Sequence, residues 1–146
     1  MAQRLSTVAP DLVTEISRMP EGRLRELASG IADAAGRETQ LDDPRFRAAL
    51  AILQSDRSDE AAVRAGVETL VQELDEVAWD IQDKLDSGEG TYDQYSRAFD
   101  RARAAAAAYW ALDSDPEVAA LESAYEASIV LQSRIQDVVA DILGSS

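Results

Sequence analysis

Residues 59–86 read DEAAVRAGVETLVQELDEVAWDIQDKLD, and this stretch decides the fold class. Its apolar side chains recur at alternating intervals of four and three residues: Val63, Val67, Leu70, Leu74, Val77, Ile81 and Leu85. That spacing predicts a long α-helix with one apolar face packed against neighbouring helices. We therefore expect an all-α protein built as a helical bundle.

Two more long helices follow along the chain. The segment SGEG at residues 87–90 is typical of a tight turn, and Thr91 with Gln94 forms a capping box that begins the next helix. Pro116, at a first-turn position, begins a last helix that we expect to run unbroken almost to the end of the chain. Short turns make consecutive helices antiparallel, so residues 58–146 are predicted to form an antiparallel bundle of three long helices.

Residues 1–57 are predicted to hold two or three shorter helices that pack against this bundle. One of them is expected over about 20–35, with Gly36 just past its end as a left-handed cap. Asp43, followed by proline, caps another. No segment is rich enough in Gly, Ser or Pro to act as a linker, so we expect residues 1–146 to form a single helical domain.

Missing residue types narrow the possible functions. The chain has no His and no Cys, which excludes disulfides, Cys-ligated metals, Ser-His or Cys-His nucleophile pairs and His-containing metal sites. The longest apolar stretch, Ala104–Leu112, is too short to span a bilayer, and the first residues lack an apolar signal-peptide core. We therefore expect a cytoplasmic protein without a membrane partner, and the frequent Arg, Ala and Asp suggest a bacterial source.

The net charge of −14 lies mostly in the second part of the chain. Residues 1–50 carry seven Arg against eight acidic residues, whereas residues 51–146 carry seven basic residues against twenty acidic ones. Direct binding to nucleic acid or to an anionic membrane is disfavoured, because both require a basic surface. A basic protein surface is the natural partner, unless the charge serves solubility alone.

An acidic band is expected on the helix over 59–86, on the side away from its apolar stripe. Its members fall within one narrow arc: Glu73, Glu76, Asp80 and Asp83. Glu73-x-x-Glu76 resembles the first half of the Mg²⁺-binding motif of the all-α nucleotide pyrophosphohydrolases, in which a later Glu-x-x-Asp completes the site. That resemblance implies a Mg²⁺-dependent enzyme. The next helix here lacks Glu-x-x-Asp, and the family's acids face the bundle interior, so we interpret the band as a solvated face and assign no cofactor.

A second acidic band is expected on the last helix. It consists of Glu122, Glu126, Asp137 and Asp141. Two acidic bands on neighbouring helices imitate spaced phosphates, which would suit a protein that occupies a basic groove. The alternative is a face that is only hydrated.

Trp79 lies among the acids of the first band. A tryptophan at this position is either covered by the N-terminal helices or exposed as the anchor of an interface, and we expect it to be covered. The other aromatic residues have helical spacing and are interpreted as core: Tyr92, Tyr95, Phe99, Tyr109 and Trp110.

The last helix has a wide apolar face near its end. The residues on it are Leu131, Ile135, Val138, Val139 and Ile142. This face spans more arc than one neighbouring helix would cover. It is either enclosed by the N-terminal helices, which we expect, or it forms a homodimer interface.

Three functional hypotheses follow. The first is a non-enzymatic interaction module that binds a basic protein surface, as inhibitors, immunity proteins and nucleic-acid mimics do. The second is the Mg²⁺-dependent nucleotide hydrolase implied by Glu73 and Glu76. The third is a scaffold that associates only with itself.

Overall fold

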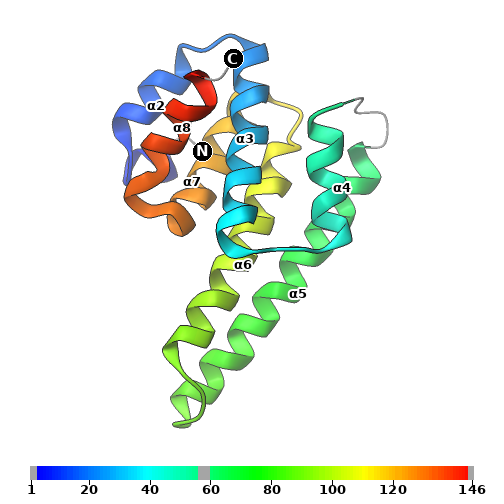
Figure 1. Ribbon diagram of the computed structural model, residues 1–146, viewed down its shortest axis with the longest axis vertical. Coiled ribbons are helices and arrows are strands. Elements are labelled where there is room, and N and C mark those ends of the chain that lie inside the picture. Colours follow the sequence, from blue (N-terminus) through cyan, green and yellow to red (C-terminus); the bar gives the residue numbers. More distant parts are fainter. Residues whose placement is uncertain (1–2, 56–59, 145–146) are drawn as a thin grey trace.

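The computed structural model describes residues 3–55 and 60–144. All regular secondary structure in these residues is helical, and they contain no strand (Figure 1). The elements are α1 (Gln3–Ser6), α2 (Pro10–Ser17), α3 (Glu21–Thr39), α4 (Pro44–Leu53), α5 (Glu60–Asp86), α6 (Tyr92–Ala111), α7 (Pro116–Leu131), the short 3₁₀ helix η1 (Gln132–Arg134) and α8 (Ile135–Gly144). The all-α prediction is confirmed. No helix in the described ranges is both long and apolar enough to cross a membrane.

Helices α3 and α6 form the centre of the fold (Figure 1). They contact each other, and both also pack against α7 and α4. Helix α6 additionally packs along α5, and α3 packs against α8. Among the described residues α5 and α7 share no extensive contact, so α6 lies between them.

Two apolar clusters meet at these central helices. Leu27 and Ile31 of α3 belong to the cluster shared with α1, α2, α7 and α8, whereas Ala28 and Ala32 belong to the cluster shared with α4 and α5. Residues 104–108 of α6, all alanine, are buried. Ala104 and Ala107 belong to the first cluster, and Ala105 and Ala108 belong to the second. Small side chains on both central helices allow their backbones to approach closely.

Helix α3 is longer than predicted, and the prediction that Gly36 caps it is wrong. The helix continues to Thr39, and Gln40 takes the left-handed conformation at its end with φ of 56°. Gly36 lies inside the helix, where a Cβ atom would stand only 2.4 Å from Cε2 of the buried Phe46. The glycine therefore accommodates the ring of α4.

The last helix is broken, and the prediction of an unbroken helix is wrong. Helix α7 ends at Leu131, and Gln132, with φ of 53°, turns the chain through η1 into α8. The turn places Ile135 and Val139 in the apolar cluster with α1, α2 and α3. The expectation that the N-terminal helices enclose this wide apolar face is therefore confirmed for its buried residues: Leu131, Ile135 and Val139.

The second half of α5 and the first half of α6 project from the rest of the molecule as a hairpin (Figure 1). No residue from Trp79 to Arg101 is buried. At the tip, Gly88 and Gly90 both have positive φ, which explains the glycines of the turn. The predicted capping box of Thr91 and Gln94 is confirmed. The sequence also predicts Ser58 as the cap of α5, but this residue lies outside the described residues.

Candidate interaction surface and buried charge cluster

Trp79 is exposed on the projecting hairpin, and the prediction that the N-terminal helices cover it is wrong. Its side chain is 62% exposed, because α4 packs against α5 while α1 and α2 pack against α7 instead. Val77, predicted to lie in the apolar stripe, is also exposed, and the buried residue is Ala78. The face of α5 that contacts its neighbours thus rotates along the helix. This is expected because a straight α-helix has about 3.6 residues per turn, so positions seven residues apart do not lie on quite the same side.

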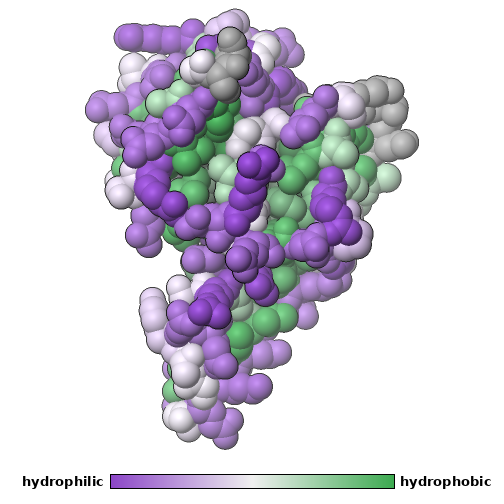
Figure 2. All heavy atoms as spheres, in the orientation of Figure 1, coloured by the Kyte–Doolittle hydropathy of each residue, from purple (hydrophilic) through white to green (hydrophobic). Residues whose placement is uncertain are grey.

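Carboxylates surround Trp79 on the surface of α5. Glu76 and Asp83 lie three residues before and four residues after it, so both are its neighbours on the same helix face. These two residues and Asp80 are exposed, and no ion pair reaches any of them within residues 3–55 and 60–144. Figure 2 shows that hydrophilic side chains cover much of the visible face of the hairpin.

Glu73 differs from the rest of the first acidic band because it has a basic partner. Arg45 donates hydrogen bonds to both of its carboxylate oxygens, each at 2.9 Å, and also contacts Asp43. The hydrogen bonds from Arg45 lower the pKa of Glu73. Among the described residues no group of three His, Cys, Asp or Glu side chains is arranged to hold a metal ion. The structure thus does not bring Glu73 and Glu76 into a common metal position.

The second acidic band does not exist as a continuous surface, and its prediction is wrong. Glu122 and Glu126 are each only 2% exposed. Asp137 and Asp141 are exposed, but they lie on α8, beyond the break at Gln132. The helix wheel failed here because the pair faces other helices and because the chain changes direction between the two halves of the band.

The two buried glutamates belong to a charge cluster that joins four helices. Arg103 of α6 lies 2.7 Å from Glu126 and 2.9 Å from Asp75 of α5. Arg4 of α1 lies 2.9 Å from Glu122 and 3.1 Å from Glu126, and its guanidinium also covers the ring of a tyrosine of α7 at 4.2 Å. Arg103 of α6 thus lies between acidic side chains of α5 and α7.

This cluster holds more negative than positive charge. The guanidinium groups of Arg4 and Arg103 form ion pairs with three carboxylates. Oε2 of Glu122 and Nε of Arg103 are both buried without a hydrogen-bond partner. Burial raises the pKa of Glu126, although Arg103 and Arg4 oppose that effect. The cluster cannot be predicted from local sequence spacing, because its members come from four separate helices, α1, α5, α6 and α7.

A pocket of about 320 Å³ opens beside this cluster at the base of the hairpin. Its lining includes charged and aromatic side chains: Arg4, Glu68, Asp75, Arg103, Tyr109, Trp110 and Glu126. A row of aromatic side chains on α6 runs from this pocket towards the tip of the hairpin. The guanidinium of Arg103 lies 5.5 Å from the centre of the Phe99 ring. The ring centres of Phe99 and Tyr95 are 5.9 Å apart, and those of Tyr95 and Tyr92 are 6.2 Å apart. Tyr92, predicted to be core, is 74% exposed.

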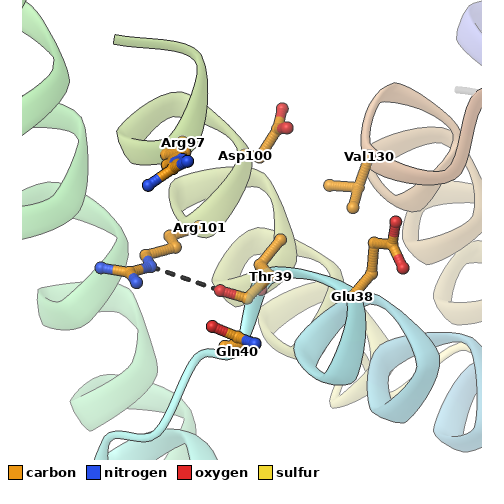
Figure 3. Close-up of a pocket in the computed structure, with 7 residues that line it drawn as sticks. All are labelled: Glu38, Thr39, Gln40, Arg97, Asp100, Arg101 and Val130. Atoms are coloured by element: carbon orange, nitrogen blue, oxygen red, sulfur yellow. Dashed lines mark hydrogen bonds between the residues drawn. The ribbon is translucent and has the colours of Figure 1, made fainter. Parts of the chain in front are cut away.

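Another pocket, of about 390 Å³, lies where the end of α3 meets α6 (Figure 3). Most of its charged side chains already have partners: Glu38 pairs with Arg134, Arg97 pairs with an aspartate of its own helix, and Nε of Arg101 donates to the carbonyl of Thr39. Burial, assisted by Glu38, raises the pKa of Asp100 in this pocket.

Comparisons with protein-family models, with curated proteins and with solved structures gave no match.

Proposed function

We propose that the protein is a non-enzymatic interaction module whose projecting α5–α6 hairpin binds a basic protein surface. The observation that carries the proposal is Trp79, which is exposed between Glu76 and Asp83. Tryptophan is strongly enriched among the side chains that anchor protein interfaces. Residues 73–93 carry eight acidic residues against Lys84 alone, which selects a partner of positive charge.

We further propose that α5, α6 and α7 make up the predicted long-helix bundle, with α7 shorter than expected because it ends at Leu131, and that α5 and α6 extend from it as the binding element. Self-association through the same face is disfavoured, because a second copy would bring two acidic hairpins together. A cytoplasmic location belongs to the same proposal, since a chain without Cys needs no oxidising compartment.

The proposal is tested by measuring how tightly the protein binds a synthetic amphipathic helical peptide that has lysines on one face and leucines on the other. Trp79→Ala is expected to weaken binding by about 2 kcal/mol, or roughly thirtyfold, because it removes the anchor. Glu76→Gln combined with Asp83→Asn should weaken it by about tenfold, and the loss should shrink as salt is added.

The matched control is Asp137→Asn combined with Asp141→Asn, which removes the same charge from α8. This control is expected to bind the peptide like the wild type. Equal losses in both double variants would show that only net charge matters, and would refute the hairpin as a binding surface. A dimeric mass by light scattering that persists in Trp79→Ala would favour the scaffold hypothesis instead.

A further inference from the structure

The pocket at the base of the hairpin lies on the same side of α5 as Trp79. Gln72 and Asp75 line the pocket, and Trp79 follows them by seven and four residues, so the three side chains share one helix face. On α6, Arg103 lines the same pocket and lies over the ring of Phe99, the first member of the aromatic row that runs to the tip. One surface therefore extends from the pocket to the exposed tryptophan.

The charges around the pocket are not balanced. Asp75 and Glu126, which line the pocket, and the adjacent Glu122 share the guanidinium groups of Arg4 and Arg103. Glu68 is exposed, and within the part of the chain that the structure describes nothing pairs with it. The pocket can accept positive charge without displacing any of the existing ion pairs.

The pocket also has an aromatic wall. Arg64 already covers the ring of Tyr109 at 4.4 Å, whereas no cation lies over Trp110 in the described residues. An indole beside an unpaired carboxylate attracts an organic cation both through its ring face and through its charged neighbour. Trp110 and Glu68 therefore supply a complementary site for an ammonium or guanidinium group on an alkyl stem.

We propose that this pocket receives a lysine or arginine side chain of the basic partner while Trp79 contacts an apolar side chain of the same segment. The proposal rests on the proposed function and makes it more specific. Gln72 and Trp79 are separated by two helical turns, so the cationic and apolar side chains of the partner should lie roughly 10 Å apart.

The two tryptophans of the chain report on the two parts of this surface separately. Their indole N–H signals can be followed by NMR while n-butylammonium is added, with sodium butyrate and n-butanol as controls. We expect n-butylammonium to shift the Trp110 signal and leave Trp79 unchanged. Glu68→Gln should weaken this binding by about fivefold, whereas Glu76→Gln, which removes an equal charge outside the pocket, should not.

The amphipathic peptide should shift both indole signals in the same titration. A peptide that shifts Trp79 while n-butylammonium leaves Trp110 unchanged would overturn the pocket proposal and leave the proposed function standing. A shift of Trp110 by n-butylammonium without any response of Trp79 to the peptide would support the pocket and refute the proposed function. Equal shifts with butyrate or n-butanol, or equal weakening in Glu68→Gln and Glu76→Gln, would also overturn the pocket proposal.

Discussion

Arg103→Ala is expected to lower the free energy of unfolding by about 3 kcal/mol at neutral pH. The substitution leaves Asp75 without its guanidinium and leaves the buried carboxylate of Glu126 with Arg4 alone. A buried charge that loses a partner costs more than the pair contributed while intact. Urea denaturation monitored by circular dichroism measures the change.

The matched control is Arg97→Ala on the same helix. Arg97 pairs with Asp93 on the exposed part of the hairpin, and both side chains are largely exposed. An exposed pair contributes little, so this variant should lose less than about 0.5 kcal/mol. Equal losses in the two variants would show that the cluster at Arg103 does not hold α5, α6 and α7 together.

The loss in Arg103→Ala should also depend on pH. Burial holds the pKa of Glu126 above its usual value, and Arg103 opposes that shift. Removing Arg103 raises this pKa further, so the folded variant binds a proton more tightly than its unfolded chain does. The variant therefore gains stability as the pH falls from the raised pKa of Glu126 towards the usual pKa of a glutamate. The difference in free energy of unfolding between the variant and the wild type should narrow between neutral pH and about pH 5. A difference that widens over this range would contradict the buried position of Glu126.

Gly36→Ala is expected to destabilise the protein by about 2 kcal/mol, although alanine is the better helix former. The added Cβ would lie 2.4 Å from Cε2 and 2.6 Å from Cζ of Phe46, whose ring is buried in the cluster of α3, α4, α5 and α6. The ring cannot retreat without displacing its neighbours, so the α3–α4 contact must open. Thermal unfolding detects the change.

Two other glycines of α3 provide the comparison. A Cβ at Gly22 meets nothing within 4 Å, so Gly22→Ala should be neutral or stabilise by up to about 1 kcal/mol. A Cβ at Gly30 would lie 2.8 Å from Cδ1 of Ile142, the flexible end of a partly exposed side chain, so Gly30→Ala should fall between the other two. A Gly36→Ala protein as stable as Gly22→Ala would contradict the packing of α4 on α3.

Local signals predicted the helices well. The capping box of Thr91 and Gln94 and the Asp-Pro pairs at Pro44 and Pro116 place helix starts where the structure has them, because each signal acts within one turn. The errors concern contacts between distant segments. The sequence around Gly36 indicates a helix cap, because the contact of this glycine with Phe46 cannot be predicted from local spacing.

The candidate site could be predicted only in part. Glu76, Asp80 and Asp83 were placed on the outer face of α5, but the exposure of Trp79 depends on where the N-terminal helices pack. The burial of Glu126 depends on arginines from two other helices, Arg4 and Arg103. A helix wheel describes one helix at a time, so it cannot distinguish a solvated acid from one that is paired in the interior.

Amide hydrogen exchange tests the hairpin most directly as the binding element. No residue from Trp79 to Arg101 is buried, so the tip should exchange rapidly in the free protein. Saturation with the lysine–leucine amphipathic peptide is predicted to slow exchange across the second half of α5 and the first half of α6, with no change in α8. Protection centred on α8, or spread evenly over all acidic helices, would contradict the account.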